Sequence, residues 1–297
     1  AVRFNGGPNA GHTCYVNNEK LITHSLPVSS LCDKVSIIGP GCVINVKTLF
    51  DEINYLEKHG IKNVWKNLLI AHNAHIITAE HLDQEKNETR IGTTRRGCGP
   101  AYASKYARTG IRAEGVSSLK EKCIDVVDYF KAAKNKYFLF EGAQGFNLDI
   151  DYGDYPYVTS CNTGVAAALT SGISHKNIKR VFGVAKAYDT YVGSKNFEPK
   201  DKIFMKIREL GKEFGATTGR ARQCNWLNLT SLNKSIAING VDTLVINKVD
   251  ILRELGEFKI IYNNTVLRMH DEKEFMNFIE ENTDVQHIIF SDNKYEI

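Results

Sequence analysis

The amino-acid sequence predicts an α/β fold, with one domain built around a large, mostly parallel central sheet and flanking helices. Short runs of β-branched and aromatic residues alternate along the chain with amphipathic segments of helical period. Glycine-rich turns recur between them, and in such sheets ligands bind beyond the carboxyl ends of the strands. Because no repeat or linker interrupts the 297 residues, a single domain over residues 1–297 is expected.

Five apolar runs are predicted to be buried strands, because their residues suit a pleated surface covered on both faces. They are Val35–Ile38, Tyr137–Phe140, Arg180–Val184, Thr243–Ile246 and His287–Phe290.

Two segments between these runs have the period of amphipathic helices. Thr48–His59 places Leu49, Ile53 and Leu56 on one face and ends before Gly60, a suitable C-terminal residue. Asp271–Glu281 does the same with Phe275, Phe278 and Ile279, and it opens with acidic residues that favour a helix N-terminus.

Composition excludes several classes of partner. The net charge of +4, from 38 basic and 34 acidic residues, does not indicate nucleic-acid or membrane binding. No apolar run approaches the roughly 20 residues that span a bilayer. The seven cysteines are scattered without a C-x-x-C pair, which predicts reduced thiols in a cytoplasmic protein.

The segment Asn5–Thr13, NGGPNAGHT, follows the short run Val2–Phe4. Its small residues let the backbone approach a ligand and offer N–H groups to phosphate oxygens. His12 is placed to donate to an oxygen that gains negative charge. A tight turn with a surface histidine is an equally good interpretation.

The segment Ile91–Arg112 contains Thr93, Thr94 and five cationic side chains, with no carboxylate. Hydroxyls and guanidinium groups together suit a phosphate monoester, although a solvated basic loop is the common alternative. In Phe140–Thr163, the amide of Gln144 can both donate to and accept from a purine edge. The aspartates at positions 149, 151 and 154 lack the spacing of a calcium loop, so structural caps and turns are expected there.

Two later segments also carry polar side chains suited to anions or bases. In Glu213–Asn228, Arg220 and Arg222 form a fork for a carboxylate or phosphate, and an RNA-binding patch is disfavoured because aromatic residues do not interleave with the arginines. The motif NKVD, Asn247–Asp250, follows a predicted strand. Its aspartate suits the two donors of a guanine edge, and it selects against adenine.

In this order, the five segments closely resemble the adenylosuccinate synthetase family over nearly the whole chain. The resemblance implies a P-loop-NTPase-like fold and a GTP-dependent ligase. That ligase would phosphorylate O6 of IMP and let L-aspartate displace the phosphate, with Mg²⁺ present. This is the first committed step from IMP to AMP.

The same resemblance implies roles for individual residues. Catalysis is assigned to His12 and Gln144, with the Gly11 backbone oxygen as a metal ligand. The implied IMP contacts are Asn9, Ala10, Gly11, His12, Thr94, Arg108, Gln144, Thr159 and Arg220. The implied aspartate contacts are Thr217, Thr218, Arg220 and Arg222. The implied GTP contacts are Gly11, His12, Thr13, Arg222, Lys248, Asp250 and Ser291. Arg108 is expected to act across a homodimer.

The sequence departs from the family's pattern in three places. The family's G-D-E-G-K-G-K loop, which carries the base for the IMP ring, is expected before Ala1, and without it the chain alone should not turn over. The region 113–136 is shorter than usual, which implies a reduced helical cap. Phe290–Glu296 replaces the family's S-T-G-P-x-R loop, so Ser291 is the residue left to serve there.

The sequence leaves two other function classes open. One is a catalytically inactive nucleotide-binding remnant of the same family, which a start codon at Ala1 would support. The other is a signalling GTPase, which would rest on NKVD alone, because the sequence has no G-x-x-x-x-G-K-[ST] motif.

Overall fold

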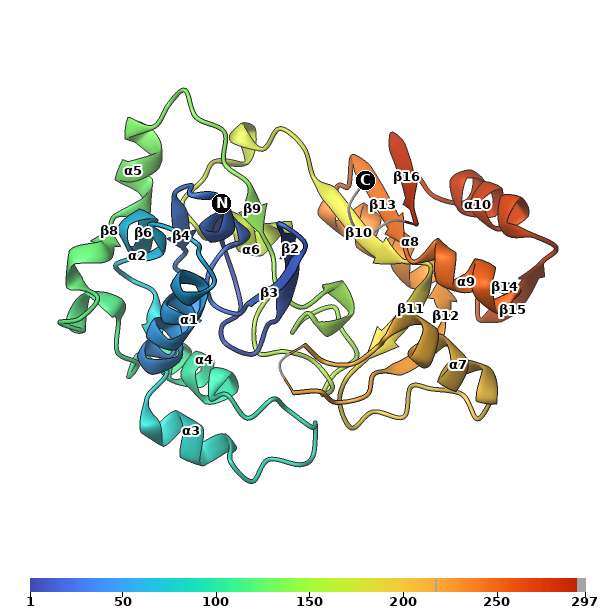
Figure 1. Ribbon diagram of the computed structural model, residues 1–297, viewed down its shortest axis with the longest axis horizontal. Coiled ribbons are helices and arrows are strands. Elements are labelled where there is room, and N and C mark those ends of the chain that lie inside the picture. The colour runs from blue at the N-terminus through green and yellow to red at the C-terminus, as the bar shows by residue number, and fades with distance from the viewer. Residues whose placement is uncertain (217, 293–297) are drawn as a thin grey trace. The chain divides into compact units, whose positions relative to one another are not determined.

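The strand β1 (Val2–Arg3) lies inside a five-stranded parallel sheet with the order β8-β6-β4-β1-β9 (Figure 1). The structure, a computed structural model, describes residues 1–216 and 218–292. The chain divides into two compact units, Ala1–Asn177 and Ile178–Ile297. The mixed α/β fold with mostly parallel pairing confirms the predicted fold class, whereas the single domain stays a prediction.

The first unit contains three sheets. Beside the five-stranded sheet it has the antiparallel hairpin β2-β3 and the parallel pair β5-β7. Its strands are β1, β2 (His12–Val16), β3 (Glu19–Thr23), β4 (Ser36–Ile38), β5 (Val43–Ile44), β6 (Leu68–Ala71), β7 (His75–Ile76), β8 (Cys123–Ile124) and β9 (Phe140–Glu141). Its α-helices are α1 (Val46–Lys58), α2 (Val64–Asn67), α3 (Ala79–Glu85), α4 (Cys98–Ala107), α5 (Val126–Ala132) and α6 (Val165–Leu169).

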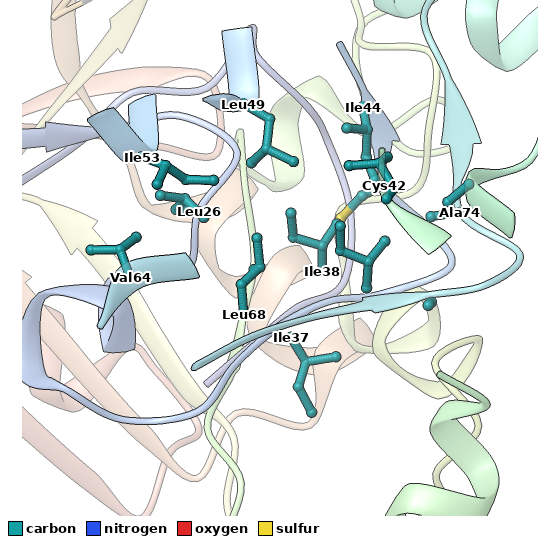
Figure 2. Close-up of a cluster of buried hydrophobic side chains, with 14 of the residues drawn as sticks. Leu26, Ile37, Ile38, Cys42, Ile44, Leu49, Ile53, Val64, Leu68 and Ala74 are labelled. Carbon is teal, nitrogen blue, oxygen red and sulfur yellow. The ribbon is translucent and has the colours of Figure 1, made fainter. Parts of the chain in front are cut away.

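Helix α1 shows why the sequence pattern predicted this packing. The side chain of Asn45 accepts a hydrogen bond from the Thr48 amide and caps the first turn. Leu49 and Ile53 pack into the same core as Ile38 of the sheet, as Figure 2 shows. Burial of each such side chain stabilises the fold by roughly 1.5–3 kcal/mol.

The second unit contains the parallel sheet β10-β13-β16 and the mixed sheet β11-β12-β14-β15. Its strands are β10 (Phe182–Lys186), β11 (Tyr188–Tyr191), β12 (Gln223–Asn228), β13 (Thr243–Asn247), β14 (Phe258–Tyr262), β15 (Thr265–Met269) and β16 (His287–Ser291). Its helices are α7 (Lys202–Gly211), α8 (Leu229–Asn239), α9 (Val249–Leu255) and α10 (Glu272–Glu281). As predicted, α10 opens on Asp271, whose side chain accepts from the Glu274 amide, and it buries Phe275 and Ile279.

Three predictions of buried strands need correction. The run His287–Phe290 forms a strand, but His287 is exposed and the three residues after it are only half-buried. The run Tyr137–Phe140 forms a strand only from Phe140, and Tyr137 is 96% exposed, because the partner β1 is two residues long. The run Arg180–Val184 does enter a strand, but Phe182 and Val184 are 55% and 70% exposed. Since β10 lies at the edge of the described three-stranded sheet, its apolar pattern does not guarantee coverage on both faces.

The region 113–136, where a reduced helical cap is expected, contains two short 3-10 turns, strand β8 and the seven-residue helix α5. Strand β8 pairs with β6, so part of this region extends the main sheet. The reduced cap itself stays a prediction.

Candidate functional site

Asn5 ties two of the predicted segments of the first unit together. Its buried side chain accepts from the Ala143 amide at 2.8 Å, and it donates to the carbonyl oxygens of Ala143 at 3.2 Å and Asn162 at 3.1 Å. Gly6 is required beside it, because its φ is +79° and a Cβ atom there would lie 2.9 Å from the Cβ of Ala143. The glycine-rich turn and the segment 140–163 therefore meet at the ends of β1 and β9.

Gln144 lies in this junction in a strained conformation. Its φ of +65° is uncommon for a residue with a side chain and costs roughly 1–3 kcal/mol. Its amide nitrogen donates to the Asn9 side-chain oxygen at 3.3 Å. Its amide oxygen Oε1 is buried and has no hydrogen-bond partner among the described residues. A buried acceptor of this kind is suited to a ligand that brings a donor.

His12 lies at the start of β2 between a carboxylate and a guanidinium group. Its Nδ1 is 2.5 Å from Oε1 of Glu141, at the end of β9. The NH1 group of Arg3, which is only 2% exposed, lies 2.8 Å from Nε2 and 3.0 Å from Nδ1 of the same ring. Three strands, β1, β2 and β9, thus bring these side chains to one place.

The charges of this cluster are interdependent. Burial raises the pKa of Glu141, but hydrogen bonding to His12 and the nearby Arg3 charge outweigh burial and lower the pKa overall. The Arg3 guanidinium also donates to the His24 carbonyl at 3.0 Å, and the His24 ring contacts the Ala10 carbonyl at 2.7 Å. The backbone of the glycine-rich turn is therefore connected to the same cluster.

The other sequence-predicted residues of the first unit lie in loops, in strand β2 and at the end of helix α4. Thr159 is half-buried and its amide donates to Leu148 at 2.8 Å, while Arg108 is exposed at the C-cap of α4. Gly11 and Thr13 are exposed, Ala10 is buried and Thr94 is half-buried. Of the five cations in the basic segment, Lys105 donates to the Pro40 carbonyl at 2.8 Å and Arg112 pairs with Glu114 at 3.7 Å.

Asp149 organises the loop after Gln144. Its carboxylate accepts hydrogen bonds from the amides of Asp151, Tyr152 and Thr163, at 2.9, 3.3 and 2.6 Å. Burial acts to raise its pKa, but these hydrogen bonds lower it overall. This is the structural role that the sequence predicted, and the described residues contain no cluster of three or more His, Cys, Asp or Glu suited to a metal ion.

In the second unit, Glu213 lies 2% exposed between two cations. Its carboxylate accepts from Lys186 at 2.9 Å, from NH1 of Arg222 at 2.7 Å and from the Tyr188 hydroxyl at 2.7 Å. Burial raises the pKa of Glu213, but the positive charge of Lys186 and the hydrogen bonds outweigh it and lower the pKa overall. Burial also lowers the pKa of Lys186, against the attraction of Glu213.

The arginine-rich loop emerges from this cluster. The Gly215 amide donates to the Arg220 carbonyl at 2.8 Å, and the Arg222 amide donates to the Glu213 carbonyl at 3.0 Å. These bonds close a short turn that includes Thr218 and Arg220. Thr217, assigned to the aspartate substrate by resemblance, lies outside the described residues, as do positions 293–296 of the predicted C-terminal loop.

The NKVD motif lies where the sequence predicted, at the end of β13. Asn247 pairs in register with Ser291 at the end of β16, and the buried Oδ1 of Asn247 has no partner among the described residues. Lys248 is the N-cap of α9 and donates to the Gly211 carbonyl at 3.1 Å, next to Glu213 in the fold. Asp250 lies in the first turn of α9 and interacts electrostatically with Tyr188. The NKVD motif and the segment Glu213–Asn228 therefore both contribute residues to the cluster around Glu213.

Comparison with known proteins decides the family. The family model for adenylosuccinate synthetase matches residues 1–128 and 116–291. The chain belongs to the adenylosuccinate synthetase family. Among its relatives, the adenylosuccinate synthetase of Fusobacterium nucleatum is 37% identical, over 87% of this chain and 73% of the relative. That of Thermoplasma volcanium is 38% identical, over 88% of this chain and 72% of the relative.

Solved structures agree with this adenylosuccinate synthetase assignment. The fully ligated adenylosuccinate synthetase of Plasmodium falciparum matches with a TM-score of 0.86 and 29% identity, covering 99% of this chain and 91% of that chain. The succinoaminodeoxyadenylate synthetase of cyanophage S-2L matches with a TM-score of 0.67 at 22% identity, covering 94% of this chain and 91% of that chain, and so shows the fold alone.

Family membership supports a ligase function in purine synthesis and implies a nucleotide substrate. It gives no support to the inactive remnant weighed from the sequence, because the relatives are named as synthetases. The signalling GTPase is contradicted by the family match. Among the described residues, no helix is both long and apolar enough to cross a membrane.

Sequence reasoning missed four side chains of these adenylosuccinate synthetase clusters. They are Arg3, Glu141, Lys186 and Glu213. A signal was present for Arg3, because a charged residue inside the apolar run Val2–Phe4 is seldom buried without a partner. Glu141 and Glu213 each stood at the edge of a segment already singled out, but Arg3 and Lys186, which pair with them, lie outside those segments.

Proposed function

We propose that this chain is a GTP-dependent ligase that forms adenylosuccinate from IMP and L-aspartate through 6-phosphoryl-IMP. The observation that carries the proposal is Gln144, beside the turn that holds Asn9 and His12, because its buried amide oxygen has no donor among the residues that the structure describes. The hypoxanthine ring of IMP carries an N–H donor on its edge and suits this acceptor. We assign the IMP contacts to the residues that the resemblance implied.

In the first step, a base takes the N1 proton of IMP, O6 attacks the γ-phosphorus of GTP, and the bond from that phosphorus to the bridging oxygen of GDP breaks. The step converts a poor leaving group on C6 into a good one. Phosphoryl transfer needs oriented donors and cations more than a covalent nucleophile. His12 would supply a donor to the oxygen that gains negative charge.

In the second step, the amino group of aspartate attacks C6, and the C6–O6 bond breaks with release of phosphate. Thr217, Thr218, Arg220 and Arg222 are the proposed aspartate contacts, and Arg222 is already oriented by Glu213 at 2.7 Å. Lys248, Asp250 and Ser291 are the proposed guanine contacts, with Gly11, His12, Thr13 and Arg222 toward the phosphates. An aspartate at a guanine edge accepts two donors that adenine does not offer.

Magnesium is part of this proposal because Mg²⁺ commonly bridges phosphate oxygens in phosphoryl transfer. The described residues offer it the Gly11 carbonyl, and no cluster of three or more His, Cys, Asp or Glu lies among them. The described residues alone therefore do not form a complete Mg²⁺ site.

We also propose a homodimer in which Arg108 reaches the partner's IMP site, and a cytoplasmic location. The exposed side chain of Arg108 on the helix end of α4 supports a role outside its own unit. All seven cysteines are free thiols, which is typical of a reducing compartment.

The proposal is tested by following adenylosuccinate formation by the full gene product while GTP, IMP and L-aspartate are omitted in turn. Product should form only when all three are present. Binding of the nucleotides without any product in the complete mixture would instead support an inactive binding protein.

The nucleotide specificity has its own test in Asp250→Asn. The asparagine amide can donate to the extra ring oxygen of xanthine, so the preference for GTP over xanthosine triphosphate should fall by about 10–100-fold. The exposed Asp284→Asn is the matched control and should keep the preference for GTP. An unchanged preference in Asp250→Asn would remove this residue from the guanine site.

The shared site is tested by mixing two inactive variants, Arg108→Ala and His12→Ala, under conditions that exchange subunits. A mixed dimer contains one site with both native residues, so part of the activity should return. No recovery, with exchange confirmed by mass spectrometry of the intact dimer, would show that Arg108 does not act in trans.

A further inference from the structure

Glu141 has no role in the reaction proposed above, yet it makes the shortest contact of the His12 ring. We propose that Glu141 is a positioning residue for His12: it fixes the proton on Nδ1 and aims Nε2 at the reacting phosphoryl group. This inference rests on the proposed function for the identity of the reacting group.

The geometry holds the carboxylate of Glu141 from both sides. Oε1 lies 2.5 Å from Nδ1 of His12, and Oε2 accepts from the Val28 amide at 2.8 Å. Glu141 ends β9 and is paired in register with Arg3 of β1, so its backbone is fixed by the parallel sheet. The side chain therefore has little freedom to release the ring.

Arg3 keeps this carboxylate ionised. Its NH1 group is 3.3 Å from Oε1 of Glu141, and its NH2 group is held by the His24 carbonyl at 3.0 Å. A guanidinium group buried to this degree needs a nearby negative charge, because an unpaired buried charge is strongly destabilising. The positive charge of Arg3 thus favours the ionised form of Glu141, which can only accept hydrogen bonds.

An ionised Glu141 determines the tautomer of the ring. Because the carboxylate only accepts, Nδ1 of His12 carries the proton that faces Glu141, and Nε2 is the ring nitrogen left to face a ligand. NH1 of Arg3 lies 2.8 Å from Nε2 and 3.0 Å from Nδ1, and the Glu141 oxygen 3.3 Å away offers it an acceptor when a ligand takes its place beside Nε2.

The tautomer can be measured on this chain without any substrate. Glu141→Gln has one acceptor oxygen for two donors, the Val28 amide and Nδ1–H of His12, so it should no longer fix the proton. Two-bond ¹⁵N–¹H correlation spectra should show protonated Nδ1 at His12 in the wild type and in the exposed control Glu57→Gln. In Glu141→Gln they should show a mixture, or protonation at Nε2. The same pattern in wild type and Glu141→Gln would overturn the proposal.

The kinetic readout uses the full gene product. Glu141→Gln should lower kcat by about 10–100-fold, with each KM changed by less than about 2-fold, because the ring is misdirected only where charge develops. Glu141→Asp keeps the charge and should recover part of kcat. An unchanged kcat, or a rise in KM alone, would contradict a positioning role.

The two readouts separate this inference from the proposed function. If the wild-type gene product forms no adenylosuccinate while the spectra change as expected, the proposed reaction fails and the positioning of His12 stands. If adenylosuccinate forms and Glu141→Gln changes neither the spectra nor kcat, the positioning role fails alone. Should Glu141→Gln not fold, as judged by circular dichroism, Glu141→Asp carries the spectroscopic test, with Nδ1 protonation expected to persist.

Discussion

Glu141 in the first unit and Glu213 in the second unit are both nearly buried carboxylates that hold a functional side chain in place. Glu141 holds His12 at 2.5 Å and has one permanent cation beside it, Arg3. Glu213 holds Arg222 at 2.7 Å and is shared with a second cation, Lys186, at 2.9 Å. The first cluster is neutral when the ring is neutral, whereas two cations and one anion leave the second with one net positive charge.

This difference separates two kinds of chemistry. An imidazole held by a carboxylate has a fixed direction for its second ring nitrogen, as the proposed role of His12 requires. A cluster with surplus positive charge suits a carboxylate or phosphate ligand, because the ligand completes the neutralisation. This contrast agrees with the roles proposed for His12 in phosphoryl transfer and for Arg222 in anion binding.

The largest effect is expected from Glu213→Ala, which leaves the half-buried cations Lys186 and Arg222 without their buried counter-charge. The free energy of unfolding should fall by about 3–5 kcal/mol, measured by urea denaturation. The matched control is Glu209→Ala on the exposed face of α7, with a change within about 0.5 kcal/mol. Equal effects of the two changes would mean that Glu213 does not neutralise the cluster.

Asp189 is a third carboxyl, and it differs from Glu141 and Glu213 because no ion pair of Asp189 is found among the described residues. Burial raises its pKa from 3.8 to about 6, while the Asn228 amide and the more distant Lys186 act to lower it. A raised pKa favours the protonated form in the folded state, so stability is lost as pH rises from 3.8 to about 6.

Asp189→Asn should therefore raise the free energy of unfolding at pH 7 by about 1–3 kcal/mol. It should also flatten the pH dependence of stability between pH 3.8 and about 6. Asp284→Asn, at an exposed position, serves as the control in the same denaturation series. A loss of stability at pH 7 would show that the Asp189 charge is compensated.

The smallest effect concerns Gln144, whose φ of +65° a glycine adopts without strain. Gln144→Gly should raise the free energy of unfolding by about 0.5–1 kcal/mol while weakening IMP binding. Gln84→Gly, in helix α3, should have the opposite sign, because glycine destabilises a helix by about 1 kcal/mol. Calorimetry of both variants with IMP separates stability from binding, and unchanged IMP affinity in Gln144→Gly would remove that residue from the site.

Local patterns predicted the helices and strand ends well, because capping and apolar period are local properties. Helix α1 starts at Val46, two residues before the predicted Thr48, and buries Leu49 and Ile53 as the spacing indicated, and NKVD lies at the end of β13. The exposure of Phe182 was not predictable, since it depends on whether a neighbouring strand lies beside β10.

The glycine-rich and arginine-rich segments could be recognised as candidate sites from residue types alone. Their anchoring carboxylates could not, because the contact of Glu141 with His12 spans 129 residues and is made only when β1, β2 and β9 assemble. Lys186 likewise reaches Glu213 across 27 residues. The meeting of the first unit's segments with those of the second stays a prediction.

The most direct test of the account follows O6 of IMP through the reaction. The full gene product is supplied with IMP labelled with ¹⁸O at that position, together with GTP and L-aspartate, and the products are analysed by mass spectrometry. If O6 is phosphorylated before aspartate attacks C6, the label is recovered in inorganic phosphate. Label recovered in water, or kept in the nucleotide product, would contradict the proposed phosphorylated intermediate.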